Sequence, residues 1–273
     1  MIVVNDGSTD LTAQIVRSFS AANPSLKVSL IEQTNQGLAA ARNEGLRVAN
    51  APLIAFLDAD DLWLSEKLQR QCALFESSAD PKLAVVYCDY ALIDAKGQEL
   101  ASSVGRIRPS LKGQVYSALL RGNFISGSGS SVLIKRSALE AVGPFDETLA
   151  ACEDWEMWLR LAAQFHFDFV PEALVHIRVH EKNMQKDANR MLGAELLVLN
   201  KLILRQQANF FLLWKIRTIL ISQNKSANTI PTFAQCSTQL KAKLSGLPML
   251  GARVLLLLPV KIAQGFLKHK NAR

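Results

Sequence analysis

The feature that most constrains this chain is the apolar run Ile54–Leu57, which leads directly into three carboxylates, Asp58, Asp60 and Asp61. A short apolar run closed by polar residues is typical of a strand buried in a parallel sheet. In open α/β sheets, ligands bind beyond the carboxyl ends of the strands. Two carboxylates one residue apart at such a place suit a divalent cation that also binds substrate phosphates. Taken alone, an Asp-x-Asp is more often a solvated turn or a helix cap, so its surroundings must decide.

Strand-like and helix-like segments alternate around this motif. Apolar strand patterns occur at 2–4, 28–31 and 53–57, and helix patterns occur at about 11–19, 38–49 and from about 65 onward. Alternation of this kind indicates βα units. The sequence therefore predicts an α/β fold with a mostly parallel sheet flanked by helices.

Six segments follow one another along the chain: 4–10, 35–45, 56–61, 143–147, 153–161 and 169–180. Together, and in this order, they resemble the family 2 inverting nucleotide-sugar glycosyltransferases of the GT-A fold. The resemblance covers roughly residues 2–190, and it implies a GT-A-like (Rossmann-like) catalytic domain over 1–190. Residues 191–273 then form a basic, apolar helical extension.

The family normally opens with an apolar strand and a helix before the segment that corresponds to Asn5–Ser8. Here Met1 falls inside the second strand of that pattern. We interpret the chain as N-terminally shortened, through a wrong start assignment or as a genuine fragment. We expect the lack of that strand to uncover backbone polar groups and apolar side chains.

The resemblance assigns the donor site to four residues, Asp6, Asp58, Asp60 and His180, and Arg42 is a further candidate. Asp6 corresponds to the carboxylate that contacts the nucleobase, although Asn5 replaces the acid that normally precedes it. Asp60 corresponds to the ligand of Mg²⁺ or Mn²⁺, and Asp58 to a contact with the ribose or the metal. His180 is a candidate third metal ligand, and Arg42 a contact to the diphosphate. The alternatives are helix capping for Asp6, a surface or packing role for His180, and an Arg42 side chain that reaches out to solvent.

The reaction itself is assigned to the pair Glu153 and Asp154. Asp154 corresponds to the general base that takes the proton of the acceptor hydroxyl, and Glu153 flanks and orients it. One displacement without a covalent intermediate inverts the anomeric carbon. Both acids can also stabilise the start of the helix that follows them. Asp61 is expected to be structural and to face the start of the next helix.

The charge of the chain is unevenly distributed. Residues 1–180 hold 16 Lys/Arg against 21 Asp/Glu, whereas residues 181–273 hold 15 against 3. A basic segment of this kind indicates a polyanionic partner. We expect an anionic membrane surface rather than nucleic acid, because 247–270 is strongly apolar and carries no nucleic-acid motif. Pro259 would kink a helix there, and a helix packed on the catalytic domain is an equal alternative.

No uncharged apolar run reaches the roughly 18–20 residues that span a bilayer, and no secretory signal is evident. Cys72, Cys88, Cys152 and Cys236 show no metal-ligand spacing. The expected location is therefore cytoplasmic and peripheral, at the inner face of the plasma membrane.

The resulting hypothesis is a metal-dependent glycosyltransferase of the hexosyltransferase type. It would move a sugar from a nucleotide-diphosphate donor, a UDP-sugar, to a glycan or lipid-linked acceptor in cell-envelope polysaccharide synthesis. The rival is a catalytically inactive, membrane-associated binding protein of the same fold. An aspartyl phosphatase fits poorly, because Asp61-Leu62 stands where such enzymes have Gly-Thr.

Overall fold

The computed structural model describes residues 1–100, 108–125, 128–181, 183–184 and 187–204. The chain divides into two compact units, Met1–Lys186 and Asp187–Arg273, and the described part of the second unit includes helix α7 (Ala188–Leu204). Most of the predicted extension 191–273, including its apolar segment 247–270, lies outside the described residues. Among the helices that are described, none has the length and apolarity to cross a membrane.

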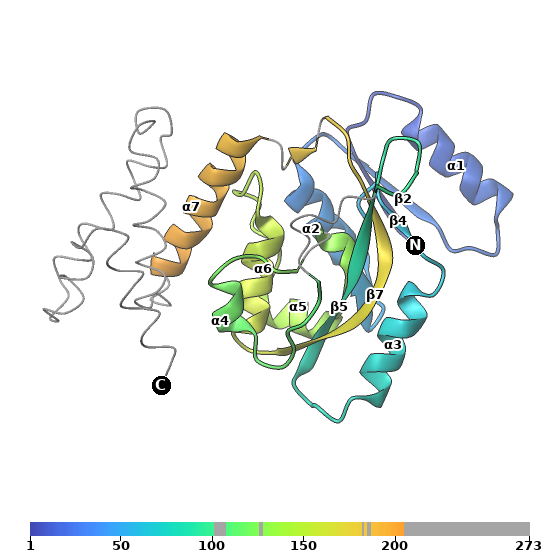
Figure 1. The fold of residues 1–273 in the computed structure, drawn as a ribbon. Helices are drawn as coiled ribbons and strands as arrows, with labels where there is room; N and C mark the ends of the chain where they lie inside the picture. Colours follow the sequence, from blue (N-terminus) through green and yellow to red (C-terminus); the bar gives the residue numbers. More distant parts are fainter. Residues whose placement is uncertain (101–107, 126–127, 182, 185–186, 205–273) are drawn as a thin grey trace, which may run out of the picture. The chain divides into compact units, whose positions relative to one another are not determined.

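The N-terminal part of the first unit is a small layer of its own. Strands β1 (Ile2–Asp6) and β2 (Ser29–Gln33) pair in parallel as a two-stranded sheet, with helix α1 (Thr12–Ala22) between them and helix α2 (Leu38–Val48) after them (Figure 1). Within residues 1–38, Asn5 is the one buried residue. The apolar face of α1 is open, since Ile15 and Phe19 are 64% and 45% exposed.

The central sheet has five strands in the order β3-β6-β5-β7-β4. They are β3 (Leu53–Ala55), β4 (Leu62–Trp63), β5 (Leu83–Ile93), β6 (Val132–Lys135) and β7 (His166–Arg178). β5 and β7 are parallel, but β6 runs antiparallel to β3 and β5, and β4 runs antiparallel to β7. The prediction of a mostly parallel sheet is therefore corrected to a mixed sheet. An apolar run marks a buried strand but carries no information on its direction.

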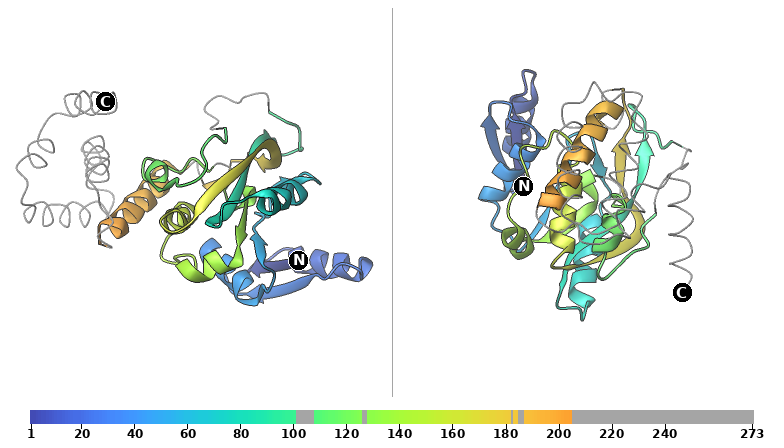
Figure 2. Two further views of the ribbon diagram at one scale, coloured as in Figure 1. Left: turned by 90° about the horizontal axis from the view of Figure 1, so that it is seen from below. Right: turned by 90° about the vertical axis from the view of Figure 1, so that its left-hand side faces the viewer.

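Helices cover both faces of the long pair β5 and β7. Helix α3 (Lys67–Ser77) lies on one side, and helices α4 (Tyr116–Leu119), α5 (Arg136–Val142) and α6 (Glu153–Ala162) gather on the other (Figures 1 and 2). The side that faces α3 holds a core of Leu83, Val86, Cys88, Val170, Leu174 and Val175. Burial on both faces explains why β5 reads as a continuous apolar run.

Strand β7 continues through Pro171. The pairing with β5 shifts there, from Cys88 with Val170 to Asp89 with Ala173. Pro171 and Glu172 therefore occupy a bulge, where a residue without a backbone N–H is tolerated. The strand runs on to Arg178 and brings it to the turn that follows β3.

Candidate active site

Residues Asp58–Asp61 form a tight turn after β3. The Asp61 N–H donates to the Asp58 carbonyl over 3.1 Å, which closes the turn. Asp60 is the carboxylate most open to solvent, with a side chain 42% exposed. Its Oδ2 lies 2.9 Å from Nε2 of His180, just beyond β7. The structure thus brings together two of the three side chains that were predicted as metal ligands, Asp60 and His180, although 120 positions separate them.

Asp61 points inward and does not cap the helix that follows. Its Oδ2 accepts from the Ser130 hydroxyl over 2.7 Å, and its Oδ1 accepts from the Arg178 N–H over 3.3 Å. Burial, with Asp58 and Asp60 nearby, raises the pKa of Asp61 to about 6. The expected structural role fits this position, but the partners are η1 (Ser128–Ser131) and β7 rather than α3.

Arg42 of α2 lies inside the protein and not at the surface, with a side chain only 5% exposed. Its guanidinium donates to Glu153 Oε1 over 2.7 Å and to Asp58 Oδ1 over 2.8 Å. The Phe56 and Phe145 rings flank the same group. Arg42 thus joins the turn after β3 to the start of α6. The alternative that it reaches out to solvent is wrong, and the predicted contact to a diphosphate stays a prediction.

The main chain of η1 approaches this guanidinium closely. A Cβ built on Gly129 would lie 3.1 Å from Nη2 of Arg42 and 3.3 Å from Cβ of Phe56. A larger residue at this position would require Arg42 or Phe56 to shift by a few tenths of an ångström.

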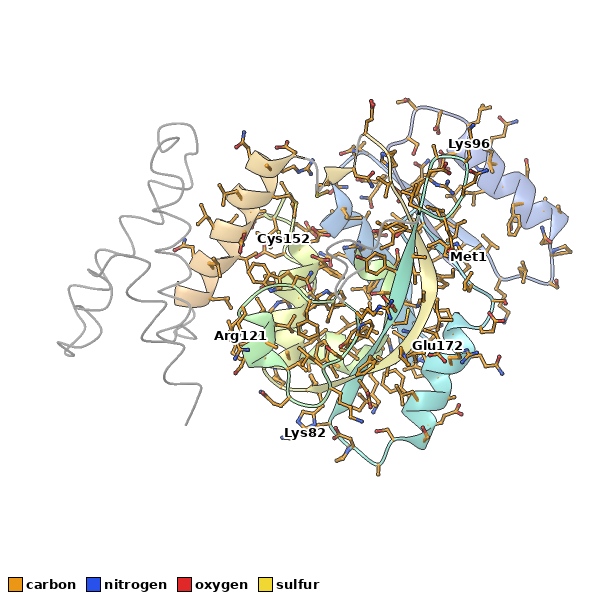
Figure 3. The ribbon with its side chains drawn as sticks, in the orientation of Figure 1. Met1, Lys82, Lys96, Arg121, Cys152 and Glu172 are labelled. Atoms are coloured by element: carbon orange, nitrogen blue, oxygen red, sulfur yellow. The ribbon has the colours of Figure 1, made fainter. Side chains whose placement is uncertain are left out.

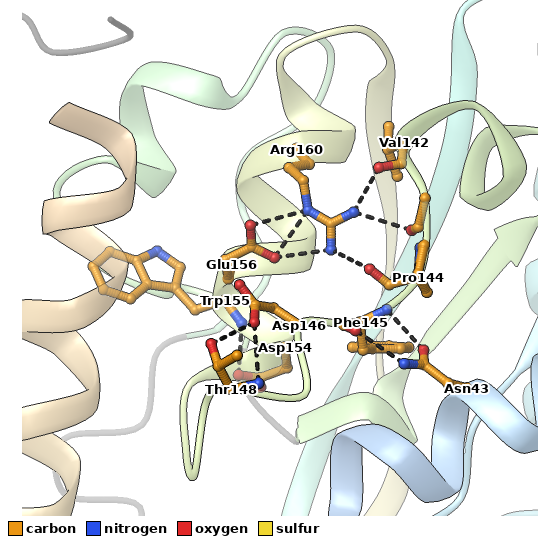
Figure 4. Close-up of polar contacts among 11 residues, drawn as sticks. Asn43, Val142, Pro144, Phe145, Asp146, Thr148, Asp154, Trp155, Glu156 and Arg160 are labelled. Atoms are coloured by element: carbon orange, nitrogen blue, oxygen red, sulfur yellow. Dashed lines mark hydrogen bonds and ion pairs between the residues drawn. The ribbon is translucent and has the colours of Figure 1, made fainter. Parts of the chain in front are cut away.

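Glu153 and Asp154 open helix α6. The residue before them is Cys152, which is labelled in Figure 3. Its backbone is left-handed with φ 60°, which is uncommon for a residue other than glycine. Glu153 is buried against Arg42, whereas solvent still reaches part of Asp154. Asp154 Oδ1 accepts from the Trp155 N–H over 2.6 Å (Figure 4). Both acids lie in the first turn of the helix, where negative charge is favourable, so the two interpretations of this pair coexist.

The environment of Asp154 suits a group that exchanges protons. Desolvation by the surrounding protein and the neighbouring Glu153 carboxylate raise the pKa of Asp154 to about 6, although the Arg42 charge opposes the rise. A base with a pKa near the working pH is effective, because it is largely deprotonated yet still accepts a proton readily.

The loop that joins α5 to α6 is held from two sides (Figure 4). The Arg160 guanidinium pairs with Glu156 and donates to the carbonyls of Val142, Gly143 and Pro144. From α2, Asn43 exchanges two hydrogen bonds with the backbone of Phe145, at 2.8 and 2.9 Å. This loop keeps the Phe145 ring against Arg42. Asn43 and Arg160 fall in two of the segments that resemble the family, 35–45 and 153–161, but no function was predicted for them.

Asp6, at the end of β1, binds the turn that precedes α2. Its carboxylate accepts from the backbone of Gln36 and Gly37, each over 2.8 Å, and from the Gln33 side chain over 2.7 Å. Burial raises the pKa of Asp6, but these hydrogen bonds outweigh it and lower the pKa below its usual value. A carboxylate offers about four acceptor positions, so three bonds leave room for a ligand N–H. Asn5, in place of an acid, accepts from the Ser8 N–H and fixes the next turn.

The fit of a cation can be judged from Asp60 and His180. Two neighbouring ligands of an octahedral Mg²⁺ ion at about 2.0–2.1 Å lie roughly 3 Å apart, close to the spacing seen here. Among the residues that the structure describes, no three His, Cys, Asp or Glu side chains are grouped as a metal site. Asp60 and His180 therefore fit as two ligands of an ion whose remaining ligands would come from substrate or water, while Asp58 is engaged by Arg42.

Comparisons with known proteins identify the family. A family model described as "Glycosyltransferase like family 2" matches residues 1–196. The chain belongs to this family. It is 29% identical to an uncharacterized glycosyltransferase of Rickettsia typhi, over 66% of this chain and 55% of the relative. It is 30% identical to one of Nostoc sp., over 69% of this chain and 58% of the relative. The chain spans about half the length of the curated relatives that it matches.

Solved structures support the fold. S. aureus TarS 1-349 in complex with UDP-GlcNAc superimposes with a TM-score of 0.56 and 20% identity, over 72% of this chain and 56% of that one. The mannosyltransferase PcManGT of Pyrobaculum calidifontis, in complex with GDP-Man and Mn²⁺, gives a TM-score of 0.54 and 21% identity, over 93% and 73%. The predicted α/β, GT-A-like fold is confirmed, apart from the strand directions corrected above.

Proposed function

We propose that this family 2 glycosyltransferase transfers a sugar, with inversion, from a nucleotide-diphosphate donor to a glycan or lipid-linked acceptor. The observation that carries the proposal is the Asp58–Arg42–Glu153 bridge. The buried guanidinium of Arg42 holds the turn Asp58–Asp61 next to Glu153, the residue before Asp154. A donor held at the turn is therefore next to a carboxylate able to accept a proton.

Each residue has a separate task in this mechanism. Asp6 accepts a hydrogen bond from the nucleobase, and a uracil imide N–H suits it. Asp60 and His180 hold Mg²⁺ or Mn²⁺, which when bound offsets the charge that develops on the departing diphosphate. Asp154 takes the proton of the acceptor hydroxyl as that oxygen forms its bond to the anomeric carbon. Glu153, paired with Arg42, keeps the start of α6 in place. One displacement inverts the centre.

The proposal is tested by donor turnover. Purified protein is incubated with UDP-GlcNAc or GDP-Man, with Mn²⁺ or with EDTA, and water serves as the acceptor of the sugar. Released UDP or GDP is quantified, while NMR follows the anomeric proton of the released sugar before its anomers equilibrate. We expect cation-dependent release of the nucleoside diphosphate and a product of inverted configuration. Nucleotide binding without release above the enzyme-free rate would favour the inactive binding protein instead.

We extend the proposal to an association with anionic membranes, in a peripheral position. Its support is the sequence after Glu195, which carries 12 Lys/Arg and no acid. Each basic residue near an anionic leaflet contributes about 1 kcal/mol. The chain should pellet with anionic vesicles more than with neutral ones. A version without 247–273 should lose this pelleting and keep donor binding; equal pelleting of both versions would refute the extension.

A further inference from the structure

One buried hydroxyl connects both ends of the carboxylate turn. Ser130, fully buried in η1, accepts from the Asp58 N–H over 3.0 Å and donates to Asp61 Oδ2 over 2.7 Å. Its removal would leave the Asp58 N–H and a buried carboxylate oxygen without this partner. Loss of a partner by a buried polar group is costly, particularly when the group is charged. The conformation of the turn thus depends on this hydroxyl.

The other side of the turn is fastened to β7. The Arg178 N–H donates to Asp61 Oδ1, and the Arg178 Nε donates to the Asp60 carbonyl over 3.1 Å. His180 follows two residues later. Asp61 therefore accepts from η1 with one oxygen and from β7 with the other, so that it fixes the distance between the turn and the segment that carries His180.

The backbone of Ser130 and Ser131 is fixed by side chains on the side of the sheet that faces α3. The Trp63 indole N–H donates to the Ser130 carbonyl over 2.8 Å. The side-chain amide of Gln71 donates to the Ser131 carbonyl over 2.9 Å. These two contacts fix the backbone of η1, so the hydroxyl has little freedom to follow a turn that moves.

A buried lysine orients that glutamine. Lys67 is fully buried, with its ammonium 4.2 Å from the centre of the Trp63 ring, and it donates to Gln71 Oε1 over 2.8 Å. Because the amide oxygen of Gln71 is occupied, its NH₂ group is directed to the carbonyls of Val86 and Ser131. Burial lowers the pKa of Lys67 to about 8. Full burial of a lysine is rare, and here it serves the bonds that support η1.

We propose that Ser130 and Asp61 are positioning residues that set Asp58 and Asp60 at the correct distance from His180 for the donor and its cation. The inference rests on the proposed function, because it names what holds the donor site in shape. In this role both residues act through the turn and not through a contact of their own with the substrate. Outer partners of metal ligands typically contribute 10–100-fold to affinity or activity, which sets the size of the expected effect.

The decisive variant is Ser130→Ala, because it removes the hydroxyl and leaves every charge of the site in place. Its matched control is Ser131→Ala, which removes the hydroxyl of the next residue, buried to the same degree. For each protein, the affinity for UDP and GDP is measured by calorimetry with Mn²⁺ and with EDTA, and stability is measured by urea unfolding. We expect Ser130→Ala to weaken the Mn²⁺-dependent affinity by about 10–100-fold, and Ser131→Ala to leave it within about threefold.

The outcomes separate the two proposals. A Ser130→Ala protein that binds nucleotide with Mn²⁺ like the wild type would overturn the positioning role while the proposed function stands. The same holds if both variants lose affinity equally and in proportion to lost stability. A wild type that binds neither nucleotide with Mn²⁺ would overturn the proposed function, and the positioning role with it. Loss confined to Ser130→Ala, with unfolding midpoints that match the control, would support the inference.

Discussion

The pairs β1–β2 and β5–β7 are both parallel, but they differ in how well they are buried. Leu83 to Asp89 of β5 are all buried, whereas β1 buries Asn5 alone and β2 buries none of its residues. β5 has a strand on either side and helices on both faces, while β1 and β2 form a sheet of two. Parallel strands gain their stability mainly from burial on both faces. The site residues therefore lie in two regions that differ in burial. Asp6 belongs to the poorly buried layer of β1 and β2, whereas the Asp58–Asp61 turn and Asp154 belong to the well-packed region around β5 and β7.

The largest expected effect is on stability, from the same substitution in the two regions. Phe167 of β7 is 1% exposed, so Phe167→Ala should lower the free energy of unfolding by about 3–5 kcal/mol. Phe19 of α1 is 45% exposed, and Phe19→Ala should change it by about 0.5 kcal/mol or less. Urea unfolding measures both. Similar losses in the two variants would mean that the N-terminal layer is covered in solution and that the contrast is false.

A second effect should stay within the N-terminal layer. Gly7 has φ 80°, and a Cβ there would lie 2.7 Å from the backbone N of Asn35, so Gly7→Ala must distort the turn beside Asp6. We expect a local cost above about 1 kcal/mol. Hydrogen exchange should rise in residues 1–36 and stay unchanged in β5.

Gly97→Ala is the matched control, because Gly97 has φ 83° but nothing within 4 Å of the added carbon. The Gly97→Ala substitution should incur the cost of a side chain at positive φ but no steric clash. Faster exchange in β5 after Gly7→Ala would show that the two regions unfold as one.

A smaller effect concerns pH and distinguishes Asp154 from Asp6. Because the pKa of Asp154 is raised to about 6, its carboxylate becomes protonated below that pH and can no longer accept a proton. We expect kcat/KM to fall about tenfold per pH unit below about pH 6. The pKa of Asp6 is lowered, so its carboxylate stays ionised through this range. An activity that is level from pH 8 to pH 5 would exclude Asp154 as the base.

Part of this arrangement could be predicted from the sequence, because it depends on patterns of neighbouring residues. An apolar run that ends in Asp58 and Asp60 indicates a strand and a ligand site, and acids before an apolar helix indicate the start of α6. The encounter of Asp60 with His180 was expected from the family resemblance and not from spacing. Their functions, like those of Arg42 and Asp6, stay predictions.

Other features depend on contacts between distant residues. Nothing local marks Ser130 among the small residues of its segment, and its importance comes from Asp58 and Asp61, about 70 positions away. Arg42 on an alanine-rich helix gives no sign of Glu153, 111 positions away. The antiparallel direction of β6 and the bulge at Pro171 likewise arise from how strands meet.

The central claim is a division of labour, in which Asp60 serves to bind the donor and Asp154 serves to carry out the reaction. The most direct test measures Mn²⁺-dependent nucleotide affinity and the turnover of saturating donor in Asp60→Asn and Asp154→Asn. We expect Asp60→Asn to lose the Mn²⁺-dependent affinity. We expect Asp154→Asn to bind like the wild type and to turn over about 10²–10⁴-fold more slowly. An Asp60→Asn protein with unchanged Mn²⁺-dependent affinity, or an Asp154→Asn protein that loses affinity but keeps the turnover of bound donor, would contradict the account.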